Sequence, residues 1–294
     1  MDNRDEVREF LATRRARLTP EQAGLPQYGG SRRVPGLRRA EVALLAGVSP
    51  DYYVRLERGN LSGVSDSVLE AVARALRLDE AERAHLHDLA RAANAGPRSR
   101  RPPKQQVRPG TLHLLHAMTD APAFVRNGRL DILAANRLAE ALYAAAFDTP
   151  ARPVNLARFC FLDPRADDLY PDWDEAANTT VALLRTEAGR DPYDKALTDL
   201  VGELATRSDD FRTLWAAHNV RLHHTGVKRF QHPVVGRVEL GFEAMPMPAD
   251  PGLTLTAYSA AAGSPAADAL RLLASWAASN EPTGHAPARE ADRT

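Results

Sequence analysis

Arginine side chains are concentrated in the N-terminal half of the chain, several of them between Leu37 and Gly59. A guanidinium group can donate two hydrogen bonds to the O6 and N7 acceptors of guanine in the major groove of DNA. We expect Arg55 to make this contact, because its position puts it on the outward side of a short predicted helix. Arg55 could instead meet a phosphate or pair with Asp51, four residues before it. The chemistry predicted for this segment is recognition of double-stranded DNA.

The remaining DNA contacts are expected from the same segment and from the loop that precedes it. Arginines at the start of the first helix suit phosphate contacts, which position a protein on the duplex without reading its sequence. The predicted DNA-binding residues are Arg32, Arg33, Arg38, Arg39, Ser49, Pro50, Asp51, Tyr52, Arg55 and Arg58.

Two short helices joined by a tight turn must position these side chains. The small Ala43 allows close packing of the helices, and Gly47 suits the left-handed conformation that often ends a helix. Ser49 then fits an N-cap and Pro50 the first helical position. Gly59 is expected to end the second helix, which would enter the major groove.

The segment Glu41-Val-Ala, Ala46-Gly-Val-Ser and Leu56-Glu-Arg-Gly59 closely resembles the XRE-type, phage-repressor-like helix-turn-helix family. The resemblance implies an all-α unit of five helices and a sequence-specific DNA-binding function. Such a short helix binds weakly by itself, so we expect a homodimer on a palindromic operator, with half-sites ~34 Å apart.

Charge is divided unevenly along the chain. In total, 38 Lys and Arg balance 38 Asp and Glu. Residues 1–110 carry 20 basic and 14 acidic residues, net +6, whereas residues 111–294 carry 18 and 24, net −6. Only residues 1–110 are therefore expected to approach the DNA phosphates. The modest charge implies few phosphate contacts per monomer, and the affinity for DNA should fall steeply with salt.

A proline-rich basic stretch without any acidic residue separates the two parts. Prolines and self-repelling charge favour an extended linker, either an arm that follows the phosphates or a solvated tether. We predict a DNA-binding domain over 1–93, this linker over 94–109, a second domain over 110–278 and a disordered tail over 279–294.

Alternating apolar residues and turn signals predict an antiparallel sheet in the C-terminal half. Asn127-Gly128 separates two apolar runs, which predicts a hairpin whose two turn residues have positive φ. Asn136 is expected to cap the following helix, and Asp172 and Glu175 have the spacing of a capping box. Further strands are predicted at Val227–His232, Gly236–Ala244 and Leu253–Ser259. The fold expected here is α+β, with about five strands and helices on one face.

Five stretches in this half look like the ligand-binding domain of MmyB-like regulators: Asp163-Pro-Arg, Tyr170-Pro-Asp-Trp173, Leu200-Val-Gly-Glu-Leu204, Phe211 to His218, and Gly226 to Gly236. Together with the helix-turn-helix, the resemblance covers about residues 5–277. It implies a multidomain regulator with a PAS-like domain, whose pocket between sheet and helices accommodates a fatty-acid-like molecule in some members.

Aromatic and basic residues of this half are the candidates for a small apolar or acidic ligand. For any one aromatic residue, packing in the core is the competing interpretation. His218 could equally be a hydrogen-bonded histidine on a half-buried helix. The candidate ligand-binding residues are Phe124, Leu142, Phe159, Trp173, Trp215, His218, Arg221, Lys228, Phe230 and Phe242.

Several function classes find no support in the sequence. The chain lacks phosphate-binding glycine motifs, a Gly-x-Ser-x-Gly motif and paired cysteines, so we expect no enzyme and no cofactor. Its histidines lack metal-ligand spacing, and Cys160 lies in an apolar run that indicates an inert buried thiol. The charged N-terminus and the absence of a long apolar run predict a cytoplasmic protein without membrane contact. The alternative to a ligand sensor is a regulator whose second domain serves only dimerisation or partner binding.

Overall fold

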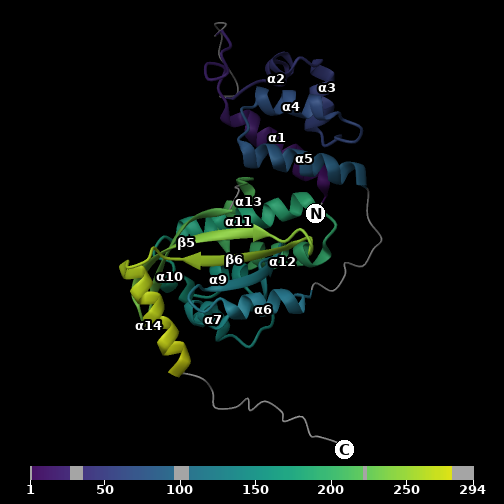
Figure 1. Ribbon diagram of the computed structural model, residues 1–294. Coiled ribbons are helices and arrows are strands. Elements are labelled where there is room, and N and C mark those ends of the chain that lie inside the picture. The colour runs from purple at the N-terminus through teal and green to yellow at the C-terminus, as the bar shows by residue number, and fades with distance from the viewer. Residues whose placement is uncertain (1, 27–35, 96–105, 221–223, 280–294) are drawn as a thin grey trace, which may run out of the picture.

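The computed structural model describes residues 2–26, 36–95, 106–220 and 224–279 (Figure 1). Its N-terminal part is all-α, as predicted, with α1 (Asn3–Arg17), α2 (Arg39–Ala46), α3 (Pro50–Glu57), α4 (Asp66–Ala75) and α5 (Glu80–Ala95). The predicted Arg32 and Arg33 lie outside the described residues.

The turn between α2 and α3 has the predicted chemistry. Gly47 adopts a left-handed conformation with φ 65°. Ser49 caps α3, since its hydroxyl accepts a hydrogen bond from the Tyr52 amide at 3.2 Å, and Pro50 occupies the first helical position. This local geometry fixes where α3 begins relative to α2.

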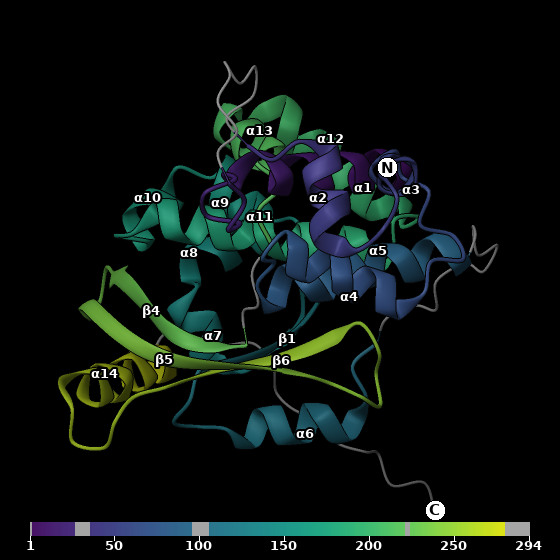
Figure 2. The same cartoon turned by 90° about the horizontal axis from the view of Figure 1, so that it is seen from above.

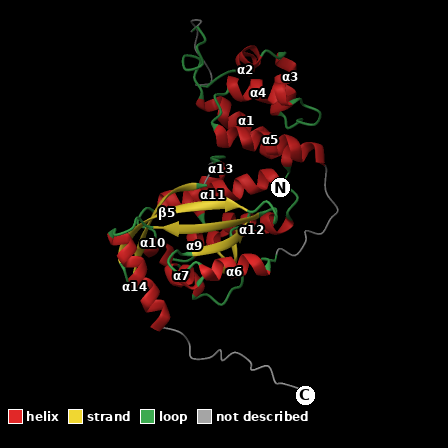
Figure 3. Ribbon diagram, in the orientation of Figure 1, coloured by secondary structure: helices red, strands yellow, loops and turns green. Residues whose placement is uncertain are grey.

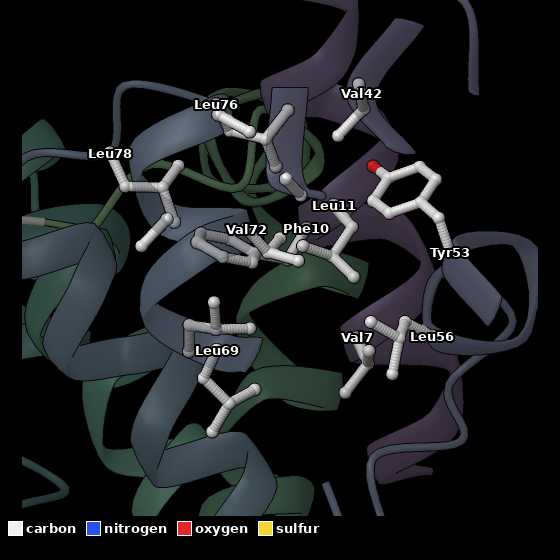
Figure 4. Packing of buried hydrophobic residues seen from close by; sticks show 14 of the residues in the cluster. Val7, Phe10, Leu11, Val42, Tyr53, Leu56, Leu69, Val72, Leu76 and Leu78 are labelled. Carbon is white, nitrogen blue, oxygen red and sulfur yellow. The ribbon is translucent and has the colours of Figure 1, made fainter. Parts of the chain in front are cut away.

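Buried apolar side chains from all five helices form one core, part of which is shown in Figure 4. Phe10, Val42, Tyr53 and Val72 are fully buried in it. Val220, which comes from the C-terminal part of the chain, packs into the same core and is also buried.

The C-terminal part contains one antiparallel sheet with the strand order β3-β2-β1-β6-β5-β4. The strands are β1 (Ala123–Asn127), β2 (Asp131–Ala135), β3 (Val154–Asn155), β4 (Thr225–His232), β5 (Gly236–Pro246) and β6 (Leu253–Ser259). The three strands expected after the helices are confirmed, with small extensions. The additional strand β3 has only two residues, too few to produce an alternating pattern.

Helices lie on both sides of this sheet, as Figures 2 and 3 show. The expectation of helices on one face was wrong, because α6 lies across the sheet from α11. The helices of this part are α6 (Pro109–Ala117), α7 (Arg137–Leu142), α8 (Ala144–Phe147), α9 (Leu156–Leu162), α10 (Arg165–Leu169), α11 (Trp173–Arg190), α12 (Lys195–Arg207), α13 (Asp209–Ala216) and α14 (Pro265–Ser279).

The β1–β2 hairpin is present, but its predicted turn geometry was wrong. Leu130, rather than Asn127 or Gly128, has a positive φ, of 66°. Asn127 remains in β1, and its side-chain oxygen accepts hydrogen bonds from the amides of Arg129 and Asp131, both at 3.0 Å. Gly128 instead leaves room for Glu187, because a Cβ there would lie 2.0 Å from the carboxyl carbon of that side chain.

Within the described ranges, the structure contains no helix that is both long and apolar enough to span a membrane.

Candidate DNA-binding and ligand-binding sites

The outward surface of α3 presents the residues predicted to meet DNA. Ser49, Pro50, Asp51 and Arg55 are exposed and Tyr52 is half-buried. The Arg55 guanidinium lies over the Tyr52 ring, 4.6 Å from its centroid. This cation–π contact restricts the Arg55 side chain before any DNA arrives.

A buried carboxylate that the sequence prediction missed connects three helices behind this surface. Glu57, at the end of α3, is 1% exposed. Its Oε1 accepts from Arg15 of α1 at 2.7 Å, and its Oε2 accepts from Arg39 of α2 at 2.7 Å. Glu57 therefore fixes α2 and α3 against α1. Its neighbours in the sequence, Leu56 and Arg58, gave no signal of this role.

The remaining predicted phosphate contacts lie at the ends of the two motif helices. Arg39 keeps 54% of its side-chain surface exposed despite its bond to Glu57. Arg38 is the N-cap of α2 and Arg58 the C-cap of α3, and both are exposed. The basic side chains consequently flank α3 on the surface that the helix-turn-helix would turn toward DNA.

In the C-terminal part, the amine of Lys228 on β4 lies among aromatic rings. Its Nζ is 4.4 Å from the ring centroid of Tyr170, 5.7 Å from that of Phe230 and 5.9 Å from that of Tyr143. Burial lowers the pKa of Lys228 to about 8. No carboxylate among the described residues forms an ion pair with Lys228. Such a cation is available to an incoming anion.

Lys228 lines a pocket between β4, β5 and the first turns of α11. The pocket has a volume of about 40 Å³ and is lined by Tyr170, Asp172, Glu175, Ala176, Thr179, Val227, Lys228, Arg229 and Phe242. This volume suits a few water molecules, whereas drug-sized ligands occupy roughly 300–1,000 Å³. An alkyl chain could enter only if side chains around Lys228 moved.

The predicted capping box at the start of α11 was wrong, and its carboxylate borders this pocket instead. Asp172 is the N-cap residue but makes no capping hydrogen bond with its side chain. Its Oδ2 instead accepts from Arg229 of β4 at 2.9 Å. This ion pair connects the beginning of α11 to the strand that carries Lys228.

A cluster of buried rings lies beneath the pocket. The hydroxyls of Tyr143 and Tyr258 are 2.6 Å apart, and Phe124 and Phe230 contact Tyr143 edge to face. Burial raises the pKa of Tyr258 to about 12 and holds the pKa of Tyr143 well above its usual value. Both phenols are therefore neutral hydrogen-bonding groups at neutral pH.

The predicted ligand residues divide into those near this cluster and those elsewhere. Phe124, Leu142, Phe159, Phe230 and Phe242 belong to one buried core with Tyr143, Tyr170 and Tyr258, and Trp173 packs against it. The three tyrosines were missed, because no pattern in the sequence separates them from ordinary core aromatics.

Two of the predicted ligand residues lie away from Lys228. His218 and Trp215 are not among the residues that line its pocket. The His218 ring instead contacts Glu9 of α1, with 2.8 Å between Nε2 and Oε2. Arg221 lies outside the described residues.

A second pocket was not predicted. It lies between α6, α7 and α14, has a volume of about 330 Å³ and is lined by His116, Met118, Thr119, Asn136, Arg137, Leu138, Ala274 and Ala277. The side chain of Asn136 is occupied, as predicted, in capping α7, where it accepts from the Ala139 amide at 2.9 Å.

Neither pocket coincides with a metal site, since no cluster of three or more His, Cys, Asp or Glu with that potential occurs in the described part of the chain. Cys160 is buried, as predicted, and burial raises the pKa of its thiol to about 11.

Each of these two parts of the chain matches a known protein family. Residues 6–86 match the family described as a helix-turn-helix domain. Residues 107–273 match the MmyB-like transcription regulator ligand binding domain. No curated protein matches the chain. The second match covers more than half of the 294 residues, and neither family is one of enzymes. The chain therefore belongs to the family of transcription regulators with an MmyB-like ligand-binding domain, here preceded by a helix-turn-helix domain.

Proposed function

We propose that this protein is a sequence-specific, homodimeric regulator whose affinity for a palindromic operator is modulated by a fatty-acid-like ligand. The ligand is an apolar molecule with a carboxylate, bound in the C-terminal domain. Residues 1–93 then act as the DNA-binding domain, 94–109 as a linker, 110–278 as the sensor and 279–294 as a tail. The protein acts in the cytoplasm.

The unpaired amine of Lys228 is the observation that supports an acidic ligand. A half-buried ammonium without a carboxylate partner is costly to maintain, and a ligand carboxylate would remove that cost. The surrounding rings of Tyr143, Tyr170 and Phe230 offer apolar surface to the adjoining part of the ligand. Because the pocket measures only about 40 Å³, the ligand enters a rearranged form of it.

DNA recognition rests on the exposed face of α3. Arg55 reads a base edge, while Arg38, Arg39 and Arg58 contact phosphates. Arg32 and Arg33, which precede α2 in the sequence, add further phosphate contacts. Two copies of α3, one from each protomer, read the two half-sites.

Binding of dodecanoate and of dodecanol to the purified full chain tests the ligand proposal. Lys228→Met keeps the length of the side chain but removes its charge, and Lys195→Met is the matched control, since Lys195 is exposed on α12 and pairs with Asp199. We expect Lys228→Met to weaken the affinity for dodecanoate about 10- to 100-fold and to change the affinity for dodecanol by no more than about twofold. Equal weakening of both compounds would contradict a carboxylate contact.

The small volume beside Lys228 favours a second candidate function, a regulator whose C-terminal domain only mediates dimerisation or partner binding. Native mass spectrometry of the purified protein separates the two proposals. A sensor yields a dimer mass together with a retained or added ligand, whereas a dimerisation module yields the dimer mass alone under all ligand conditions.

A further inference from the structure

The contact between the N-terminal helices and the C-terminal domain contains charged side chains that solvent does not reach. Helix α5 packs against α11 (Figure 1), and α1 reaches α11 through the side chains of Glu6 and Arg185. Arg185 of α11 is 0% exposed, Glu6 of α1 is 4% exposed and His85 of α5 is 1% exposed. Burying such groups is expensive unless their partners are held in place, so this contact requires a defined geometry.

Hydrogen bonds define that geometry. The Arg185 guanidinium donates to the Glu6 carboxylate and to Nδ1 of His218, the latter at 2.8 Å. Because arginine can only donate, Nδ1 of His218 accepts, which leaves Nε2 to donate to Glu9 of α1 at 2.8 Å. The same guanidinium stacks over Trp215, 4.0 Å from the ring centroid. Five side chains, from α11, α1, α13 and the residues just after α13, thus form one connected network across the contact.

The approach of α11 to α5 depends on the absence of one side chain. A Cβ at Gly189 of α11 would lie 2.5 Å from Cε1 of His85. The His85 ring is buried and packs edge to face on Phe10, with 5.0 Å between centroids, so it has little room to move. Only glycine at position 189 permits the observed distance between the two helices.

The other end of α11 borders the Lys228 pocket. Glu175, Ala176 and Thr179, from its first two turns, line that pocket. Fourteen residues separate Glu175 from Gly189, a rise of ~21 Å in one uninterrupted helix. A displacement of its first turns therefore reaches the contact with α5 without an intervening hinge.

We propose that α11 couples the state of the Lys228 pocket to the docking of the N-terminal helices, through its contact with α5 at Gly189 and its network at Arg185. The ligand in this mechanism is the fatty-acid-like molecule of the proposed function, and the ligand-dependent part of the inference rests on that proposal. A ligand that enlarges the pocket moves the start of α11, so docked and undocked arrangements bind it with different affinity. The orientation of α3 relative to its counterpart in a dimer changes as a result.

Hydrogen exchange of residues 80–95 in the full chain measures the docking. Gly189→Ala adds the clashing methyl group, and Gly202→Ala on α12 is the matched control, because a Cβ there meets nothing within 4 Å. Both changes raise helix propensity by a similar amount, which keeps the helices intact. We expect about tenfold faster exchange in Gly189→Ala and no change in Gly202→Ala. If Gly189→Ala does not fold, Arg190→Ala replaces it, because it removes the interdomain ion pair with Asp88.

Two perturbations of the pocket then test the coupling. Lys228→Met needs no ligand, and dodecanoate serves as the ligand probe. Each is expected to change the exchange rate of residues 80–95 by about threefold or more in the wild type and in Gly202→Ala. Neither should change that rate in Gly189→Ala, where the contact between α11 and α5 is already disturbed. If dodecanoate does not bind, the ligand proposal fails and Lys228→Met alone decides the coupling. The inference would be overturned if Lys228→Met left the exchange rate of residues 80–95 unchanged and dodecanoate, where it binds, also left that rate unchanged.

Discussion

The guanidinium of Arg185 donates a hydrogen bond to the carboxylate of Glu6, 179 residues earlier in the chain, and both side chains are buried. Burial alone would raise the pKa of Glu6. The adjacent guanidinium of Arg185 and the neighbouring His218 and His85 rings outweigh burial and hold the pKa of Glu6 well below its usual value. The ionised form of Glu6 is therefore part of the native structure.

Glu6→Gln should lower the free energy of unfolding by about 3 kcal/mol, because it leaves Arg185 buried without its counter-charge. Since the folded-state pKa of Glu6 is depressed, the stabilisation is present above about pH 4.5 and is lost as pH falls below it. Urea unfolding between pH 3 and pH 7 measures this, and the difference between wild type and variant should shrink toward acid pH. Glu203→Gln, in a more exposed pair with Arg158, is the control and should cost at most about 1 kcal/mol.

Arg55→Ala should weaken binding to the specific operator by about 1–3 kcal/mol and hardly change binding to unrelated DNA. The reason is that a base contact carries sequence information, whereas phosphate contacts do not. An operator selected from a random library supplies the specific site for fluorescence anisotropy at fixed salt. Arg91→Ala, whose side chain is 73% exposed on α5, is the control. An equal loss on both DNAs would show that Arg55 meets only the backbone.

The affinity for dodecanoate should depend on pH through Lys228. The amine is charged below its pKa of about 8 and loses its charge as pH rises through that value, so dodecanoate should bind more weakly at pH 9 than at pH 7. Isothermal titration calorimetry across this range, with dodecanol as the uncharged comparison, measures the effect. A pH-independent affinity for dodecanoate would contradict a contact with Lys228.

Tyr143→Phe should destabilise the protein by about 1 kcal/mol, because it removes the hydroxyl pair with Tyr258 from a buried site. Thermal or urea unfolding measures this, with Tyr193→Phe as a control at a side chain that is 46% exposed. A change of the same size in both variants would show that the buried hydroxyl pair contributes nothing specific.

Local patterns in the sequence predicted the helix-turn-helix well. Gly47, Ser49 and Pro50 each act on neighbouring backbone, so their roles are visible within a few residues of chain. The capping role of Asn136 was predicted for the same reason.

Predictions failed where distant contacts decide the outcome. Gly128 accommodates the side chain of Glu187 rather than a turn with positive φ, and Asp172 pairs with Arg229 rather than with its own helix. The burial of Glu57 depends on Arg15, 42 residues away. No local pattern contains such information, since each partner lies in another element of the fold.

The Lys228 site was predicted only in part. Lys228 and its aromatic neighbours Phe230 and Phe242 could be proposed from residue type and strand position. The placement of Trp215 against Arg185 of α11 and of His218 beside Glu9 of α1 could not, because it follows from contacts between distant segments of the chain.

The position of Val220 has a consequence for the stability of the N-terminal helices. This residue follows α13 in the chain, yet its side chain completes the apolar interior of the N-terminal helices. A fragment cut before α6 would lack that side chain and would expose Glu6 and His85 to water. In the docked arrangement the helix-turn-helix and the C-terminal domain stabilise each other, so we expect them to melt together in one calorimetric transition.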